Sequence, residues 1–434
     1  MAKLVDVGSI GCYFESLSDP RHTRNRKHLL VDIAVIAVCG ILCGCDGPTA
    51  IHRWAALQAD WLFQYLTLPN GIPSRDCIRR LLLALKPEAF QRCFQAWITD
   101  AMSTGDNDLK RLVAIDGKTN RRSHDRAKDL GALHIVSAWA SEEGIALGQV
   151  ATDTKSNEIT AIPQLLDQIN LADTIITIDA MGCQKDIVEQ IVDGGGDCVI
   201  AVKDNQPTLK AAIQTYFNDH LERDLEDLQY RFHETSDTGH GRKDERTYFL
   251  TKPPRDFGPK EDWPWVKAIG YTLRLTQHDD GTETDEVRYY ICTRYLSGKR
   301  FAEAVRNHWS IESMHWVLDV NFREDDSRTR ERTLGNNLSW LRRFAITLLK
   351  RHPRQRQSQR QNETLHDQHG LSYRSPIPES RLICAGRGRP HRLVRVNSRP
   401  RLSANQPCPD THMTDVQRTH HQITLTRMNV HFNI

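Results

Sequence analysis

Residues 112–119 read Leu-Val-Ala-Ile-Asp-Gly-Lys-Thr, and this stretch decides the fold prediction. Its apolar and β-branched run, Leu112 to Ile115, is typical of a buried strand. The run stops at Asp116, and Gly117 follows at once. Ligands of open α/β sheets bind outside the carboxyl ends of strands, so we predict that Asp116 ends a strand at such a site.

A second stretch repeats this pattern. Residues 174–182 read Thr-Ile-Ile-Thr-Ile-Asp-Ala-Met-Gly, again an apolar run that ends in an acid, Asp179. Two carboxylates on neighbouring strands can hold a divalent cation, because Mg²⁺ prefers carboxylate oxygens. Paired cations about 3.5–4 Å apart clamp the attacking and leaving oxygens in two-metal phosphodiester cleavage. The two stretches therefore indicate phosphodiester chemistry.

The segments around the two acids alternate between strand and helix patterns. Strand patterns occupy 111–115, 133–140, 145–152, 174–178 and 197–202, and helix patterns occupy 160–170 and 184–193. Further strand patterns lie at 246–251, 267–276 and 287–293, and helix patterns return at 300–320 and 336–350. This order predicts a mixed α/β sheet in a catalytic domain at 106–350, with a β-rich insertion at about 220–298.

The first 105 residues are expected to form a separate helical domain. Helix patterns occupy 28–43, 49–66, 74–85 and 87–98, with Ser74 as the N-cap of the third. That third helix carries Arg75, Arg79 and Arg80. Two interpretations stay open here. The domain is a DNA-binding bundle that uses these arginines, or it is a helical packing module whose arginines are solvated.

The 434 residues carry a formal net charge of only +3, unevenly distributed. From Arg351 onward there are 14 arginines, no lysine and 5 acids, whereas the first 350 residues carry 44 basic and 50 acidic groups. DNA binding by the body must therefore depend on local patches. The most apolar stretch, 29–45, is short and contains Asp32, so we expect a core helix and no membrane span. Absence of a signal-peptide pattern predicts a cytoplasmic protein.

The tail, 351–434, is rich in Arg, Gln, His, Ser and Pro and lacks a periodic apolar pattern. Up to Lys350 the basic residues include both Lys and Arg, whereas from Arg351 onward they are all Arg. A basic nucleic-acid-binding tail explains this change. Translation past a frameshift into an unselected reading frame also explains it, and the nucleotide sequence of the gene decides between the two.

A third acid is expected on a helix, and Glu312 is the candidate. On a helix Glu312, His315, Trp316 and Asp319 share one face, because they lie at positions i, i+3, i+4 and i+7. An acid, an imidazole and another acid on one face favour a role at the site. The alternative is a buried face with Glu312 as an ion-pair partner. Trp309 and Trp316 are expected in the core.

Taken together, these segments resemble the insertion-sequence DDE transposases, in the branch that includes the H-repeat-associated proteins. The likeness runs through roughly residues 10–350 as short matches in a fixed order. The matches include Asp19-Pro20-Arg21, 68–74, 114–118, 155–159, 179–181, 201–206, 240–242 with Arg246, and 308–316. Many matches in the right order are far more specific than any one of them.

The resemblance implies an RNase H-like core in which Asp116, Asp179 and Glu312 form a catalytic, metal-binding triad, with β strands inserted before the glutamate. It implies Mg²⁺ as the cofactor, with Mn²⁺ as a substitute and two ions in the site. It also implies strand cleavage at the inverted-repeat ends of a mobile element and attack of the freed 3′-hydroxyl on target DNA. Joining two ends of double-stranded DNA predicts a homodimer on DNA, associated with a prokaryotic nucleoid.

Basic and polar residues near these segments are the expected DNA contacts. They are Lys118, Arg121, Arg122, Lys203, Asn205, Arg242 and Arg246, with His308, His315 and Asp319 as candidate supporting residues. Contacts of this kind position the DNA backbone without reading its sequence. The spacing between Glu312 and His315 is one residue shorter than in the family pattern. One residue turns a helix by about 100°, so the role of His315 at the site is less secure than that of Glu312.

Two alternatives to an active transposase stay open. One is a transposase-derived protein that binds DNA ends but no longer cuts, because its C-terminus is out of frame. The other is a nuclease of the same fold in repair or defence, which would cut without a preference for paired inverted repeats.

Overall fold

A computed structural model describes residues 7–102, 110–152, 158–239 and 241–351. The interpretations of the tail beyond Arg351, of residues 155–157 and of His240 fall outside these ranges. Within the ranges, no helix combines the length and the apolar composition that a membrane span requires.

The amino-terminal part of the described chain is helical, as predicted. Its α-helices are α1 (Val7–Cys12), α2 (Leu30–Leu42), α3 (Pro48–Leu57), α4 (Ala59–Leu62), α5 (Arg75–Ala84) and α6 (Pro87–Met102). Ser74 caps α5, because its Oγ accepts a hydrogen bond from the backbone N–H of Cys77 at 3.2 Å. The predicted helix at 49–66 is two helices, since the backbone at Gln58 (φ −104°, ψ 18°) leaves the helical range.

Among the described residues, nine strands form one sheet in the order β3-β2-β1-β4-β5-β9-β8-β7-β6. The strands are β1 (Arg111–Asn120), β2 (Leu133–Ala140), β3 (Ile145–Thr152), β4 (Thr174–Ile178), β5 (Asp197–Val202), β6 (Tyr230–Gly239), β7 (Arg242–Thr251), β8 (Ala268–His278) and β9 (Glu283–Cys292). β1, β4 and β5 are parallel, whereas the other neighbours pair antiparallel. The predicted mixed α/β sheet is confirmed.

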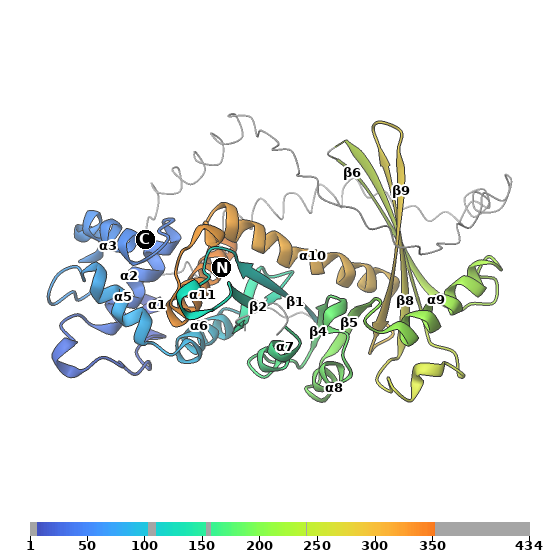
Figure 1. Cartoon of the computed structure of the whole chain (residues 1–434), viewed down its shortest axis with the longest axis horizontal. Coiled ribbons are helices and arrows are strands. Elements are labelled where there is room, and N and C mark those ends of the chain that lie inside the picture. Colours follow the sequence, from blue (N-terminus) through green and yellow to red (C-terminus); the bar gives the residue numbers. More distant parts are fainter. Residues whose placement is uncertain (1–6, 103–109, 153–157, 240, 352–434) are drawn as a thin grey trace. The chain divides into compact units, whose positions relative to one another are not determined.

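Helices cover both faces of this sheet. They are α7 (Glu158–Leu166), α8 (Lys185–Asp193), α9 (Pro207–Leu221), α10 (Gly298–Val320) and α11 (Arg332–Arg351). Val113 and Ile115 of β1 pack into one apolar cluster with residues of α7, α8 and α9. Ala114 points to the opposite face, into a cluster that contains Ile311 and Met314 of α10. Helix α10 contacts β1, β4 and β5 as well as β6 and β7, so it crosses most of the sheet (Figure 1).

Strand β1 is longer than predicted, and this corrects the position of Asp116. Parallel pairing with β4 ends where Ile115 lies opposite Ile178, but antiparallel pairing with β2 continues to Asn120. Asp116 therefore lies inside a strand, at the point where the parallel neighbour ends. The polar residues after Ile115 suggested a strand end, yet the partner strand β2 continues beside them.

Steric crowding explains why position 117 of this strand is a glycine. A side chain at this position would collide with His134 of β2 and with Glu158 at the start of α7. The glycine therefore lets two polar side chains pack directly against the backbone beside Asp116.

The β-rich insertion extends the core sheet instead of forming a sheet of its own. β9 pairs with β5, and β8, β7 and β6 follow outward. Helix α9, which precedes these strands, was not predicted. The insertion and the core therefore share one continuous hydrogen-bonded sheet.

The amino-terminal helices and the core also share one apolar cluster. Phe94 of α6 packs against Phe344 of α11, with ring centroids 4.3 Å apart. Asn337 of α11 donates hydrogen bonds from Nδ2 to the carbonyl oxygens of Leu82 (2.7 Å) and Leu85 (3.0 Å), at the end of α5. Helix α11 thus fixes α5 to the core.

Candidate active site

The three predicted acids line one pocket, which we call the acid pocket. Asp116 comes from β1, Asp179 directly follows β4, and Glu312 lies on α10. They border a volume of about 200 Å³ together with Lys203 and His308. The topology explains this meeting, because β1 and β4 are parallel neighbours and α10 crosses both.

Asp179 is held by a short turn at the end of β4. Its Oδ1 accepts a hydrogen bond from the backbone N–H of Met181 at 3.0 Å. Asn205 donates from Nδ2 to the carbonyl oxygen of Ala180 at 2.6 Å. Asn205, which the sequence suggested as a DNA contact, therefore also stabilises the turn that positions a site carboxylate.

The charges in the acid pocket are unbalanced. Burial raises the pKa of Asp116 to about 7, and the negative charges of Asp179, Glu158 and Glu312 add to the rise. Burial also raises the pKa of Glu312, against the opposing charge of Arg288. The neighbouring carboxylates thus disfavour the charged form of Asp116, an environment that a bound cation would relieve.

Two candidate supporting histidines lie beside these acids. His315 is buried, and its Nδ1 lies 3.5 Å from Asp116 Oδ2, so the changed spacing in the sequence does not remove it from the site. Burial lowers the pKa of His315 to about 3, which leaves the ring neutral at neutral pH. His308 Nδ1 lies 3.1 Å from Thr177 Oγ1, and burial lowers the pKa of His308 as well.

The acid pocket suits a divalent cation in chemistry and charge. It offers carboxylate oxygens from three separate elements, and such oxygens are ligands of Mg²⁺ and Mn²⁺. In the described part of the chain, no three His, Cys, Asp or Glu side chains are grouped so that they could hold a metal ion as they stand.

Lys118 points into the protein. It is buried, and its Nζ pairs with Asp319 Oδ1 at 2.7 Å and with Asp325 Oδ1 at 3.0 Å. A phosphate contact by Lys118 would have to displace these acids. The geometry therefore gives Lys118 and Asp319, which the sequence suggested for the site, an internal role beside it.

Arg121 and Arg122 keep the exposure that DNA contact requires. Their side chains are 82% and 57% exposed. Arg121 pairs with Asp325 at 3.2 Å and Arg122 pairs with Asp326 at 3.3 Å. Exposed ion pairs contribute about 0–1 kcal/mol to stability, so a phosphate can replace these partners at little cost.

Behind Lys118 lies a buried ion cluster centred on Glu324, which we call the Glu324 cluster. Glu324 Oε1 lies 3.2 Å from Arg343 Nη1, and neither side chain is exposed. Burial alone would raise the pKa of Glu324, but the charges of Arg343, Lys118 and Arg342 outweigh it and hold the pKa at about 2. Arg343 also donates from Nε to Ser137 Oγ of β2 at 2.9 Å. The cluster ties α11 to the strand beside β1.

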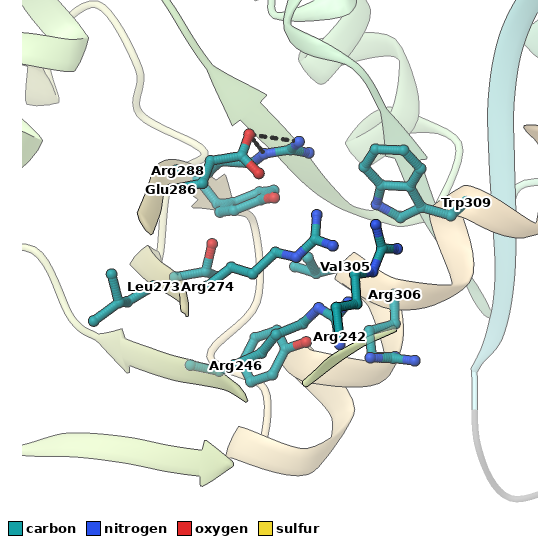
Figure 2. A pocket seen from close by; sticks show the side chains of 12 residues that line it. Arg242, Arg246, Leu273, Arg274, Glu286, Arg288, Val305, Arg306 and Trp309 are labelled. Atoms are coloured by element: carbon teal, nitrogen blue, oxygen red, sulfur yellow. Dashed lines mark hydrogen bonds and ion pairs between the residues drawn. The ribbon is translucent and has the colours of Figure 1, made fainter. Parts of the chain in front are cut away.

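A second pocket, which we call the arginine basin, lies where the insertion meets α10 (Figure 2). Its volume is about 290 Å³. It is lined by the guanidinium groups of Arg242, Arg246, Arg274, Arg288 and Arg306. It shares Arg288, Tyr290, Val305 and Trp309 with the acid pocket. The two pockets are therefore contiguous.

Asp244 organises the arginines of the basin. Its two oxygens accept hydrogen bonds from Nε and Nη2 of Arg274, both at 3.0 Å, and from Nη2 of Arg246 at 2.9 Å. The Asp244 side chain is only 7% exposed. Each guanidinium carries five N–H donors, so both arginines keep donors for a ligand.

Trp309 and Trp316 are exposed, and the prediction that they belong to the core was wrong. Their exposed fractions are 44% and 52%. Helix α10 turns Ile311, Met314 and its neighbouring apolar residues inward, which leaves both tryptophans on the outer side. The guanidinium carbon of Arg288 lies 5.1 Å from the centre of the Trp309 ring, at the edge of the basin.

Arg274, Arg288 and Arg306 were not predicted as site residues. The cross-strand register explains the omission, because Arg246 lies opposite Arg274 and Thr272 lies opposite Arg288. Strand patterns in the sequence show which residues alternate, but they do not show which residues of different strands become neighbours. Arg306 joins them only because α10 crosses β7.

A buried polar pair also lies beneath β1, and its imidazole, His134, was not predicted. His134 Nε2 and Glu158 Oε1 lie 2.6 Å apart, and both side chains are almost fully buried. The charge of Glu158 contributes to the raised pKa of Asp116. This pair is a fourth acid and an imidazole close to the triad, on the opposite face of the sheet.

Two family models match this chain. The model described as DDE_Tnp_1-associated matches residues 12–98, and the model described as Transposase DDE domain matches residues 107–349. The chain belongs to the DDE transposase family. The family assignment that the sequence motifs suggested is therefore confirmed.

Curated relatives of this DDE-family chain agree with the assignment. YncI of Escherichia coli O157:H7, provisionally named a transposase, is 37% identical over 350 residues, which are 80% of this chain and 88% of that protein. YhhI of Escherichia coli K12, an H repeat-associated protein with the same provisional name, is 36% identical over 77% of this chain and 88% of its own length. A piggyBac transposase synaptic complex with hairpin DNA aligns at 9% identity and a TM-score of 0.31, a likeness too slight to support any inference.

Proposed function

We propose that this protein is a DNA transposase that cleaves phosphodiester bonds at the inverted-repeat ends of an insertion sequence and joins those ends to target DNA. One observation carries the proposal: Asp116, Asp179 and Glu312 line one pocket that is contiguous with a pocket of five arginines. Carboxylates that can hold cations, beside guanidinium groups that can hold phosphates, are the two parts that phosphodiester chemistry requires.

The catalytic core that we propose is RNase H-like. The first five strands lie in the order β3-β2-β1-β4-β5, with β2 antiparallel to its neighbours and β4 and β5 parallel to β1. β6 to β9 enter before the helix that carries Glu312. This topology supports the arrangement that the family resemblance implied.

Asp116, Asp179 and Glu312 would hold Mg²⁺, or Mn²⁺ in its place, and two ions fit the number of carboxylates. When bound, such ions lower the pKa of water and stabilise charge on the attacking and leaving oxygens. Neutral His315 would orient Asp116 Oδ2, and the turn fixed by Asn205 would orient Asp179. His308, whose Nδ1 lies 3.1 Å from Thr177 Oγ1, lines the same pocket as Asp179 and would support that carboxylate.

The arginine basin would hold the DNA backbone next to the reacting bond. Arg242 and Arg246 were expected to bind DNA, and Arg274, Arg288 and Arg306 join them in the same pocket. Exposed Lys203, which lines the acid pocket, and exposed Arg121 and Arg122 would add further contacts to the backbone. Because two DNA ends must be joined, we also propose a homodimer on DNA and a location at the prokaryotic nucleoid.

Cleavage of a labelled duplex that carries the element's own terminal repeat tests this function. With Mg²⁺ or Mn²⁺, the wild-type protein should nick the duplex at the repeat boundary, and Asp116→Ala should not. Binding without cleavage in the wild type would indicate the impaired remnant. Equal cleavage of a duplex without the repeat would indicate a general nuclease. Full activity of Glu312→Ala would overturn the third acid and direct attention to Asp319.

A further inference from the structure

Helix α5 of the amino-terminal helices has two chemically distinct faces. Ile78, Leu81 and Leu82 are fully buried. Arg75, Arg79 and Arg80 lie on the other side and are exposed. The helix starts at its cap Ser74, whose Oγ accepts a hydrogen bond from the backbone N–H of Cys77. This is a rigid helix that presents arginines from its amino-terminal half.

A basic loop lies beside the start of α5. It contains Arg24 and Lys27, both exposed. Two contacts fix the loop there: Asn70 Nδ2 donates to the carbonyl oxygen of Lys27 at 2.5 Å, and Arg21 Nη1 lies 3.9 Å from Cys77 Sγ. The loop and the helix, which are far apart in the chain, therefore form one basic surface.

The positive charge of this surface is only partly balanced. Asp19 pairs with Arg21 and Arg26, and Asp76 pairs with its neighbour Arg75. Within the described ranges, no carboxylate lies in ion-pair distance of Arg24, Lys27 or Arg79. A surface of this kind attracts the phosphates of nucleic acid more strongly than the acidic body of the chain does.

Helix α5 is rigidly connected to the acid pocket. Asn337 of α11 binds the carbonyl oxygens of Leu82 and Leu85 at the end of α5. Further along α11, Arg343 binds Ser137 of β2, and Ser137 lies directly opposite Asp116 in the β1–β2 pairing. A DNA segment bound to α5 would therefore lie on a helix that is hydrogen-bonded, through α11, to the sheet that carries Asp116.

We propose that α5 is the helix that reads the sequence of the terminal repeat, by entering the major groove with Arg75, Arg79 and Arg80 while Arg24 and Lys27 bind flanking phosphates. An α-helix fits the major groove, and arginine binds the O6 and N7 atoms of guanine with two hydrogen bonds. The inference rests on the proposed function and adds the surface that selects the DNA. It separates selection, by α5, from backbone holding, by the arginine basin.

The test measures binding of the full-length protein to two fluorescent duplexes in EDTA, so that no cleavage occurs. One duplex carries the terminal repeat that flanks the gene, and the other carries the same bases in scrambled order. The double variant Arg79→Ala, Arg80→Ala should lose roughly 30-fold or more in affinity for the repeat, at about 1–3 kcal/mol for each arginine, and far less for the scrambled duplex. Arg92→Ala, an exposed arginine on neighbouring α6, is the matched control and should bind as the wild type does.

Each other outcome overturns the proposal. Equal losses on both duplexes would mean that the arginines hold the backbone and read nothing, and no loss would mean that α5 is a packing helix with solvated arginines. Thermal unfolding of each variant shows whether the fold is kept, and Arg79→Lys with Arg80→Lys, which preserves charge but not the paired hydrogen bonds, should also lose selectivity. Because binding is measured without metal, a protein that selects the repeat but never cuts would disprove the proposed function and leave this inference intact.

Discussion

The acid pocket and the Glu324 cluster each receive one residue of β1, Asp116 and Lys118, yet the carboxylates of the two groups behave in opposite ways. Burial and neighbouring acids raise the pKa of Asp116 to about 7. Three cations hold the pKa of Glu324 at about 2, although it is the more buried of the two. Burial is common to both, so the difference comes from the neighbours. Charge left unbalanced indicates a site for a ligand, and balanced charge indicates a structural role.

Among the variants that test this difference between the acid pocket and the Glu324 cluster, Asp116→Asn is expected to have the largest effect. We expect cleavage to fall by roughly a thousandfold or more, which corresponds to about 4 kcal/mol of lost transition-state stabilisation. Thermal stability should stay equal or rise, because a carboxylate repelled by its neighbours is removed. A clear fall in the melting temperature would break the comparison, since Asp116 would then be structural as well.

Glu324→Gln should show the reverse pattern. It leaves Arg343 and Arg342 buried without their anion, and removing one partner of a buried ion pair costs about 3–5 kcal/mol of unfolding free energy. Urea unfolding followed by circular dichroism measures the loss. The matched control is Asp326→Asn in the same turn, which removes two exposed ion pairs, with Arg122 and Arg323, and should cost far less, about 1 kcal/mol or below. Equal losses in both variants would contradict a structural role specific to Glu324.

The pH dependence of stability should follow Glu324. Its pKa is depressed in the folded protein, so its contribution is present above the unfolded value, near pH 4.5, and is lost as the pH falls towards about 2. Between about pH 2 and pH 4.5, the free energy of unfolding should change less with pH in Glu324→Gln than in the wild type. Parallel curves would show that other carboxylates control acid unfolding.

The smallest effect is expected in the arginine basin, where several cations share one ligand. Arg274→Gln should weaken DNA binding by about fivefold to tenfold and reduce the slope of log affinity against log salt by about 1. Lys243→Gln is the control, because Lys243 lies on the adjoining strand β7 but does not line the basin. A loss in Lys243→Gln of the same size would show that general charge, and not the basin, holds the DNA.

The sequence predicted the core of this fold closely. The bounds of β2, β3, β4 and β5 match the predicted strands, because each is a short apolar run between polar turns. Asp179 also lies where its pattern placed it. Strand β1 was cut short at Asp116, since Gly117 and Lys118 resemble a strand end unless their partners His134, Glu158 and Asp319 are known.

The candidate site was predicted only as far as local patterns reach. Asp116, Asp179 and Glu312 could be found because each lies in a distinctive segment. The arginine basin could not, because Arg246 and Arg274 meet through cross-strand register. Lys118 was expected at the DNA, yet it pairs with Asp319 and Asp325, acids that lie about 200 residues later in the chain.

The pairing of β5 with β9 has a consequence for anyone who wishes to shorten this protein. Residues 199–202 of β5 hydrogen-bond to residues 289–292 of β9, so the insertion seals the edge of the central sheet. Deleting β6 to β9 to obtain a minimal core would expose a flat, apolar strand edge, which is a template for chain-to-chain pairing. The shortened chain should precipitate or form oligomers, and a soluble miniature will need a replacement strand or a charged edge at β5.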